Sequence, residues 1–447
     1  MRRPATTRAV PVLPSTASLI VWLTEPAACK RFVNGATFFF HRSDTLSVRE
    51  TLSHLIFRGR AFDGEKLHQK AVLDIDSETG VIAGFGERGS LETRKDAKMV
   101  DLGDSTVLPG LIDAHVHFYS STGVGVNAWA AVPDTLAVLR GAGDMKKLLS
   151  AGFTAVRDLG SKGGVHLAQA VEEGATEGPA VVSCSRALAQ TGEDDDPPAF
   201  PLDIAQKLAT YTYFCDGPWE CRRAVRKVVR DGGKVVKFYA SGAFSRGGRV
   251  RPNFTDEEIQ AIVDESHRAG LPVAAHAYGE EALSAAVKAG VDSIEHGLGL
   301  TAEIAREMAK KGIYYVPTLT VYQLKTYANR NKKLVTQHLN DDLVVAMEKG
   351  VEVVTGSDIV GDADRPHGMS HREIMAEAKF IGNLDALVAS TSRAAKCIRL
   401  EGRGMLKEGF RADVAVVKGD PSKDIGAVAP EKVTHVLKGG RTVFLRS

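Results

Sequence analysis

The stretch Thr255–Leu319, TDEEIQAIVDESHRAGLPVAAHAYGEEALSAAVKAGVDSIEHGLGLTAEIAREMAKKGIYYVPTL, decides the fold. It alternates amphipathic helical segments with short apolar runs that are typical of buried strands. In the first helical segment Ile259, Ile262 and Val263 share one face. Thr255, followed by acidic residues, is the expected N-cap of this helix. Connections this short between successive strands imply right-handed crossovers and a parallel sheet.

Short apolar runs of the same kind lie on both sides of this stretch. They are TAVRDLG at 154–160, AVVSCS at 180–185, KVVKFYA at 234–240 and EVVTGSD at 352–358. Eight or so β/α units in one parallel sheet close most simply into a barrel. We therefore predict an α/β fold, a TIM (β/α)8 barrel, over residues 109–404.

Both ends of the chain have the pattern of β-structure instead. Residues 54–108 and 405–447 hold short strand-like runs broken by Gly, Asp and Ser. We predict that these two ranges pair beside the barrel as a small composite β-sandwich domain. Residues 1–53 are predicted to be an N-terminal extension of unclear structure. Their apolar part loosely resembles a signal peptide, but Pro11 and Pro14 interrupt it.

The composition is that of an ordinary globular protein. Of the 447 residues, 25% are charged and 44% are hydrophobic. A net charge of +2 gives no reason to expect binding to nucleic acid or to an anionic membrane. The 5 cysteines form no CxxC pair, so we expect them to be reduced and the protein to be cytoplasmic, with secretion left open.

Six side chains that can bind metal lie at or near the ends of the strand-like runs. They are His115 and His117 in LIDAHVHF, Lys237 in VVKFYASG, His276 in VAAHAYG, His296 in SIEHG and Asp358 in VTGSD. A parallel barrel gathers its strand ends at one face, where catalytic groups meet. We therefore predict a two-metal hydrolase site. Imidazole nitrogen suits Zn2+, and also nickel, iron or manganese.

The four histidines differ in how strongly they point to a metal. His115 and His117 are at positions i and i+2 of a strand, so both rings point to the same side and can converge on one cation. The alternative is a pair of surface histidines. Taken singly, His276 and His296 have the pattern of core histidines, but their recurrence at successive strand ends favours a role as ligands.

Lys237 and Asp358 complete the predicted set. A lysine ammonium has no lone pair, but burial near cations lowers its pKa. The neutral amine can then add carbon dioxide, and the carbamate is an anionic bidentate ligand able to bridge two metals. A lysine that extends from the strand to solvent is the alternative. The Asp358 carboxylate could hold one metal and take the proton from the attacking water, or it could simply cap a turn.

Together these motifs resemble those of the amidohydrolase superfamily. The shared features are the HxH after an LPGLID lead, the KxxASG lysine, the two later histidines and the TGSD aspartate. Within that superfamily the chain is most similar to the imidazolonepropionase-like branch, which includes Xaa-Pro dipeptidases of the carboxylated-lysine type and a fungal ochratoxin-hydrolysing amidase. The similarity runs from about Leu55 to the C-terminus.

The resemblance also implies a role for each ligand. The HxH pair would hold the more buried of two metals and the later histidines the second one. Carboxylated Lys237 would bridge them, and Asp358 would ligate and act as general acid/base. Tyr239, on the same strand face as the lysine, would polarise the scissile carbonyl, unless it is only a packed barrel aromatic.

Three features bear on the substrate. His367 in RPHGMS matches a histidine of relatives that contacts substrate or supports a ligand. Arg246, in a Gly-rich loop after the lysine strand, could reach a substrate carboxylate. Relatives carry a TGGHGD-like stretch where this chain has TGEDDD at 191–196. We expect this acidic loop to overlie the pocket, so the substrate preference of the relatives does not transfer.

We therefore predict a binuclear metal-dependent hydrolase that uses a metal-activated hydroxide. Its substrate would be a small amide or peptide, such as an Xaa-Pro dipeptide or an N-acyl amino acid, including ochratoxin-like amides. A cyclic amide, lactone or ester hydrolysed in the same site is an alternative. A non-catalytic scaffold of this fold is a remote one, because all six ligands are retained. By analogy with relatives we expect a homo-oligomer.

Overall fold

The computed structural model describes residues 30–33, 36–39, 53–87, 89, 94, 97–244, 250–325 and 329–446. The chain divides into two compact units, Met1–Thr51 and Leu52–Ser447. In the first unit, strands β1 (Lys30–Val33) and β2 (Ala36–Phe39) pair antiparallel. The rest of the predicted N-terminal extension up to residue 52 lies outside the described residues. The domain boundaries proposed from the sequence stay a prediction.

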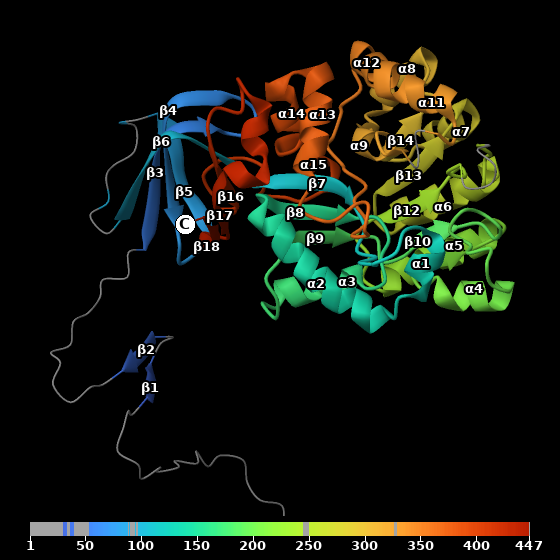
Figure 1. The fold of residues 1–447 in the computed structure, drawn as a ribbon, viewed down its shortest axis with the longest axis horizontal. Helices are drawn as coiled ribbons and strands as arrows, with labels where there is room; N and C mark the ends of the chain where they lie inside the picture. Colours follow the sequence, from blue (N-terminus) through green and yellow to red (C-terminus); the bar gives the residue numbers. More distant parts are fainter. Residues whose placement is uncertain are drawn as a thin grey trace, which may run out of the picture. The chain divides into compact units, whose positions relative to one another are not determined.

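One seven-stranded sheet of the second unit joins the two ends of that unit (Figure 1). Its strands are β3 (His54–Phe62), β4 (Leu67–Asp76), β5 (Val81–Glu87), β6 (Ala97–Pro109), β16 (Val414–Lys418), β17 (Val433–Lys438) and β18 (Arg441–Leu445). The order is β18-β17-β16-β6-β3-β4-β5. Strand β6 is parallel to β3 and antiparallel to β16, with Pro109 opposite Val414 and Ser105 opposite Lys418. The predicted composite β-structure is thus present as one hydrogen-bonded sheet.

The middle of the chain forms parallel strands, as the alternating pattern predicts. They are β7 (Leu111–Val116), β8 (Phe153–Asp158), β9 (Ala180–Ser183), β10 (Ala187–Ala189), β11 (Thr212–Phe214), β12 (Val236–Tyr239), β13 (Val273–Tyr278), β14 (Ser293–Leu298) and β15 (Tyr314–Val316). Their orders are β7-β8-β9 and β11-β10-β12-β13-β14-β15, and the neighbouring strands are parallel.

The segment 352–359, of which residues 352–358 were predicted as a strand, connects the two groups of parallel strands without forming a regular strand. It makes isolated parallel bridges to β15 (Tyr315 with Val353) and to β7 (Val116 with Ile359). Gly356 explains the close approach to β7, because a Cβ at this position would lie 2.8 Å from the Cβ of His115. The segment therefore carries Asp358 to the end of β7.

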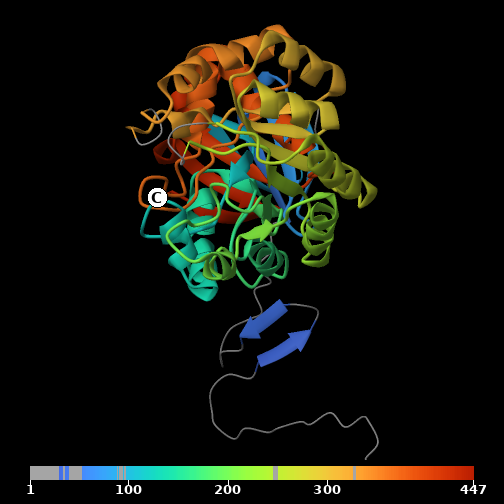
Figure 2. The ribbon, with the colours of Figure 1, turned by 90° about the vertical axis from the view of Figure 1, so that its right-hand side faces the viewer.

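Helices lie around the outside of the parallel strands (Figure 2). They are α1 (Val126–Ala131), α2 (Asp134–Ser150), α3 (Gly164–Glu172), α4 (Leu202–Leu208), α5 (Pro218–Arg230), α6 (Asp256–Arg268), α7 (Glu280–Ala289), α8 (Ala302–Lys311), α9 (Leu319–Tyr322), α11 (Lys332–Gln337), α12 (Leu343–Glu348), α13 (His371–Ile381), α14 (Asn383–Ala389) and α15 (Ser392–Cys397). The chain also forms a π-helix, η1 (His338–Asp342), and two 3-10 helices, η2 (Ile425–Val428) and η3 (Pro430–Lys432).

Helix α6 shows why these segments are helical. The predicted N-cap is confirmed: Thr255 accepts a hydrogen bond from the Glu258 backbone N–H, and the Glu258 side chain accepts one from the Thr255 N–H. The predicted apolar face is buried, with Ile259 and Ile262 at 1% and 0% exposure. Among the described residues, no helix has the length and apolarity needed to cross a bilayer.

Candidate metal centre

The HxH pair lies at the end of β7, and its geometry leaves one nitrogen of each ring free. His115 Nδ1 is hydrogen-bonded to Glu295 Oε2 at 2.8 Å, and His117 Nδ1 donates to the Gly160 carbonyl at 2.8 Å. A proton on Nδ1 leaves a lone pair on Nε2. The ring centroids are 5.3 Å apart. The two Nε2 atoms therefore point toward a common place, as the i, i+2 spacing predicts.

Asp358 meets this pair from the segment 352–359. Its Oδ1 lies 3.5 Å from His115 Nε2 and 3.2 Å from His117 Nε2. Ligand atoms of the three residues all lie within 4.8 Å of one another, as in a site that could hold one metal ion. Burial raises the pKa of Asp358, but the contact with His117 and the charge of Arg365 outweigh it and hold the pKa below its usual range. The carboxylate is thus ionised at neutral pH.

The two later histidines extend the cluster. The His296 ring lies 4.9 Å from the His115 ring and 4.7 Å from the His276 ring, measured between centroids. His296 Nδ1 is hydrogen-bonded to Thr318 Oγ1 at 2.7 Å, which leaves Nε2 available. His296 has a φ of 67°, in the left-handed region that non-glycine residues seldom adopt. The backbone turn redirects its side chain toward the other imidazoles.

Lys237 on β12 is the buried cation of the cluster. It is 1% exposed, and its ammonium makes no hydrogen bond or ion pair within the described part of the chain. Its Nζ lies 5.0 Å from the centre of the Tyr239 ring. Burial lowers its pKa, although the charges of Glu295 and Asp358 raise it in part. Such a lysine is poised to lose its proton, which is the requirement for a ligand.

The chemistry of these side chains fits divalent metal ions. His115 Nε2 and His276 Nε2 are buried polar atoms without a hydrogen-bond partner. Orphaned buried polar atoms are rare in native proteins and indicate a missing ligand or ion. Burial, and then the Lys237 charge, lower the pKa of both histidines, so both are neutral and able to donate a lone pair.

A buried ion-pair network holds the His115 ring through its Nδ1 atom. Glu295 Oε1 accepts hydrogen bonds from Arg157 Nη2 at 2.7 Å and from Ser293 Oγ at 2.5 Å, while Oε2 binds His115. Arg157 also donates from Nε to the Ala114 carbonyl at 2.6 Å. Sequence reasoning missed both charged residues. The signal was present, because two charged side chains inside predicted buried strands require a partner.

Arg365 is a second residue that the sequence did not single out. Its Nη1 donates to the backbone oxygen and to Oδ2 of Asp358, at 3.2 and 3.3 Å. The side chain is 7% exposed. It therefore fixes the orientation of the Asp358 carboxylate. No periodic pattern marks this residue, because it lies in the loop between Asp358 and α13.

The three predicted substrate residues have different positions. Tyr239 is half-buried, with its ring 5.4 Å from the His276 ring. His367 is buried and does not lie among the candidate metal ligands: its Nε2 donates to the His117 carbonyl at 2.9 Å and its ring stacks on Phe118. It therefore supports the HxH segment. Arg246 lies outside the described residues.

The acidic loop 191–196 lies against the end of β12. The Ala243 backbone N–H donates to Asp194, and Asn253 Nδ2 donates both to Glu193 Oε2 at 3.5 Å and to the Tyr239 carbonyl at 3.2 Å. Asp195 is 8% exposed. The loop thus brings carboxylates next to the strand that carries Lys237.

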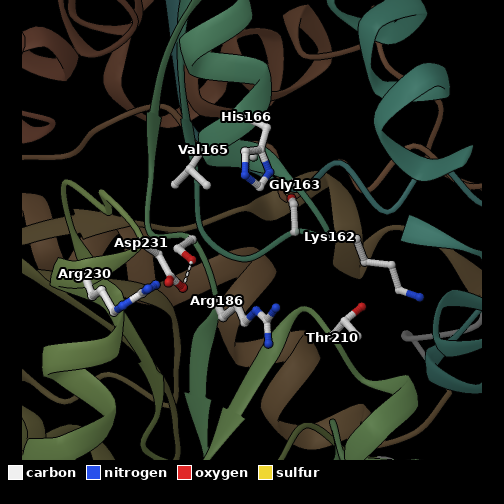
Figure 3. Close-up of a pocket in the computed structure, with 11 residues that line it drawn as sticks. Lys162, Gly163, Val165, His166, Arg186, Thr210, Arg230 and Asp231 are labelled. Atoms are coloured by element: carbon white, nitrogen blue, oxygen red, sulfur yellow. Dashed lines mark hydrogen bonds between the residues drawn. The ribbon is translucent and has the colours of Figure 1, made fainter. Parts of the chain in front are cut away.

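A separate cavity of about 300 Å³ lies near the ends of β8 and β9 (Figure 3). It is lined by Lys162, His166, Arg186, Arg230 and Asp231 among others, and Ser185 Oγ donates to Asp231 there at 3.0 Å. None of the six predicted ligands lines it. This cavity is therefore not the candidate metal centre, which is formed by the six converging side chains.

Comparison with known proteins gives a consistent result. A model of the amidohydrolase family matches residues 106–443. The ochratoxinase of Aspergillus niger is 31% identical over 419 residues, which cover 85% of this chain and 84% of the relative. The crystal structure of that ochratoxinase superposes with a TM-score of 0.80 at 28% identity, over 88% of this chain and 96% of the other.

Two crystal structures of peptidases resemble this chain about as closely as the ochratoxinase structure does. A crystal structure of a prolidase complexed with N-methylphosphonate-L-proline has a TM-score of 0.79 and 30% identity, covering 88% of this chain and 100% of that chain. A crystal structure of an Xaa-Pro dipeptidase with methionine bound in its active site has a TM-score of 0.76 and 28% identity, covering 88% and 100%.

Proposed function

The chain belongs to the amidohydrolase family, whose members similar to it hydrolyse amide bonds, and we propose that it is a two-metal hydrolase of a small amide or peptide. The observation that carries the proposal is the convergence of His115, His117, His276, His296, Lys237 and Asp358, with two buried imidazole nitrogens left without a partner. An Xaa-Pro dipeptide or an N-acyl amino acid, including ochratoxin-like amides, is the proposed substrate class. The substrates named for the similar proteins support this class.

Two divalent ions, with Zn2+ as the proposed metal, would be held by these six side chains. When bound, they supply a Lewis acid for the scissile carbonyl and lower the pKa of a bound water. Lys237 takes part as a carbamate: its neutral Nζ forms a bond to the carbon of carbon dioxide, and one proton leaves. The product is an anion that suits a position between two cations.

The side chains of the protein carry out the proton transfers. Asp358, ionised and held in place by Arg365, accepts a proton from the attacking water and passes it to the leaving nitrogen. The Tyr239 phenol O–H donates a hydrogen bond to the developing oxyanion. The His367 bond to the His117 carbonyl keeps the HxH segment in position. No covalent enzyme intermediate is required.

The proposal extends to the architecture. We propose that β7–β15 and the segment 352–359 close into a (β/α)8 barrel, and that the seven-stranded sheet folds over as a composite β-sandwich. The bridges of that segment to both β7 and β15 support closure. We propose a homo-oligomer in the cytoplasm, without nucleic-acid or membrane partners.

The test is the metal content of protein purified with zinc and bicarbonate, run beside a panel of Xaa-Pro dipeptides and N-acyl amino acids. Close to two metals per chain together with hydrolysis supports the proposal. Two metals without turnover on the panel would move the substrate to a cyclic amide, lactone or ester. A chain that binds no metal under these conditions would be a non-catalytic scaffold.

A further inference from the structure

A larger cavity, of about 850 Å³, lies between helix α3 and the turn that joins β17 to β18. Residues of α3 and β9 line one side of it, and the segment before β16 and both ends of the turn line the other. It adjoins the cavity of Figure 3, because His166 and Asp231 line both. None of the six candidate metal ligands lines it. Its volume is within the ~300–1,000 Å³ range of sites for small organic ligands.

Four cationic side chains line the side of this cavity that the turn forms, and we call them the basic cluster. They are Arg403, Arg411, Lys438 and Arg441. The Arg411 guanidinium lies against the turn, because a Cβ at Gly439 would be 2.5 Å from its Nη2. Lys438 and Arg441 are directly opposite each other in the antiparallel pairing of β17 with β18. Like charges in that position destabilise a pair of strands.

One carboxylate, that of Asp413, is buried beside the cluster. Its Oδ2 accepts a hydrogen bond from Arg403 Nη1, and its Oδ1 accepts one from the Gly439 N–H at 2.7 Å. Asp413 is 5% exposed, and each of its oxygens is engaged by one of these donors. Its charge therefore offsets that of Arg403 and leaves the rest of the cluster unbalanced.

The other three cations have no anionic partner. In the part of the chain that the structure describes, Arg411, Lys438 and Arg441 form no ion pair with a carboxylate. Lys438 Nζ donates to the Gly178 carbonyl at 2.6 Å, and its remaining N–H groups are available to a ligand. Burial lowers the pKa of Lys438 to about 8; the Asp413 charge opposes this, and the charges of the three arginines add to it. The cluster thus holds charges that repel one another and that a bound anion would balance.

The carboxylates across the cavity do not neutralise the cluster. Glu173 accepts a hydrogen bond from Gln169 Nε2 at 2.6 Å, and Asp231 accepts one from Ser185 Oγ at 3.0 Å. Glu172 is exposed to solvent at the end of α3, where its charge is screened. Among the described residues, none of these three carboxylates forms an ion pair with the basic cluster.

We propose that the basic cluster binds the phosphate groups of a small ligand, at a site separate from the metal centre. Arginine presents a planar fork of donors that matches two phosphate oxygens, and lysine adds a compact charge. A single phosphate group carries about −1.5 to −2 charges at pH 7, so a diphosphate comes closer to balancing three cations. The rest of the cavity has room for the organic part of a diphosphate ester. This inference does not depend on the proposed function.

The experiment measures binding to the full-length protein by calorimetry, at constant ionic strength because salt screens such contacts. The probes are inorganic pyrophosphate, uridine diphosphate and citrate. Tighter binding of uridine diphosphate identifies an ester as the source of the phosphate groups, and tighter binding of pyrophosphate identifies the free ion. Citrate has a comparable charge on carboxylates alone, and it should bind more weakly than the preferred diphosphate.

Arg411→Gln and Arg441→Gln each remove one charge from the cluster. Each should weaken binding of the preferred diphosphate about tenfold or more, because a hydrogen bond between charged groups is lost. Arg306→Gln is the matched control. Arg306 is exposed on α8 and does not line the cavity, so the dissociation constant should not change. Phosphate groups bound to metal ions instead would bind the variants and the wild type equally.

The melting temperature of the protein without ligand is a second readout. Because Arg441 faces a like charge, Arg441→Gln should leave this temperature unchanged or raise it. The preferred diphosphate should then raise the melting temperature of the wild type more than that of the variant. If Arg441 has a structural role instead, the variant without ligand melts at a lower temperature, which contradicts the proposal.

Three binding results would overturn the site. The first is a diphosphate affinity that neither substitution in the cluster changes. The second is citrate binding as tight as that of the diphosphates, and the third is a wild-type protein that binds none of the probes. None of these results bears on the two-metal function, because metal content and turnover are measured separately.

Discussion

Glu295→Gln is the substitution whose effect the structure allows us to work out furthest. One carboxylate oxygen of Glu295 accepts hydrogen bonds from Arg157 and Ser293, and the other is hydrogen-bonded to His115. The side chains of Glu295 and Arg157 are 0% and 2% exposed. The glutamine has the same shape but no charge. It leaves the Arg157 guanidinium buried without a counter-ion and gives His115 Nδ1 a weaker acceptor.

The magnitudes follow from these contacts. Breaking one partner of a buried ion pair costs about 3–5 kcal/mol, a large part of the ~5–15 kcal/mol that keeps a typical domain folded. Loss of a carboxylate that supports a metal-binding histidine lowers metal affinity about 10–100-fold. We therefore expect a protein that is folded but markedly less stable, and that gives up zinc to a weaker chelator than the wild type does.

The assay is urea unfolding of the metal-free protein together with competition for zinc. Glu307→Gln is the matched control, because Glu307 is 47% exposed and its nearest cation is 3.8 Å away; it should change stability by less than about 0.5 kcal/mol. In a double-mutant cycle, the protein with both Arg157→Met and Glu295→Gln should lose ~1–3 kcal/mol less free energy of unfolding than the sum of the losses in the two single variants. Simple additivity, or a Glu295→Gln protein as stable as the control, would refute the reasoning.

Three further predictions concern the site and its surroundings. Asp358→Asn should abolish turnover while most of the metal stays bound, measured by steady-state kinetics and metal analysis; an undiminished kcat removes Asp358 from proton transfer. Tyr239→Phe should lower kcat about 100-fold or more with a smaller change in KM, and equal losses in both would argue against an oxyanion contact. Burial and the Glu373 charge raise the pKa of Glu377, so its ionisation destabilises the fold as the pH rises above ~4.3. Glu377→Gln should leave the melting temperature nearly unchanged at pH 5 and raise it at pH 9; an equal rise at both pH values would contradict this.

The sequence predicts where the candidate metal ligands lie because their placement follows local rules. An HxH at a strand end puts both rings on one side, and the carboxyl ends of parallel strands meet. The seven-stranded sheet from both chain ends was likewise foreseeable from its short strand-like runs. Residues 352–358 were predicted as a strand, but close packing at Gly356 and the left-handed φ of 53° at Asp358 interrupt it.

The supporting residues could not be predicted in the same way, because their partners are distant in sequence. A regular strand places Glu295 and His296 on opposite faces, yet both contact His115. The left-handed backbone of His296 makes this possible, and strand periodicity contains no sign of it. The link from Arg365 to Asp358 depends on the path of a loop, and the position of Asp195 depends on contacts of the loop 191–196 with the end of β12.

The pairing of β6 with β16 has a consequence for how the chain is made. Thr106 Oγ1 donates to the Gly419 carbonyl across a separation of 313 residues. At ~5–20 residues per second, a ribosome needs on the order of 15–60 s to synthesise that interval. Throughout this time one side of β6 has no neighbour, and an unpaired strand edge is a template for association with other chains. The last strands therefore cover the free edge of β6 only when synthesis is nearly complete. Chains that end before Val414, through a shortened message or through proteolysis, should aggregate. They should not give an inactive but folded enzyme.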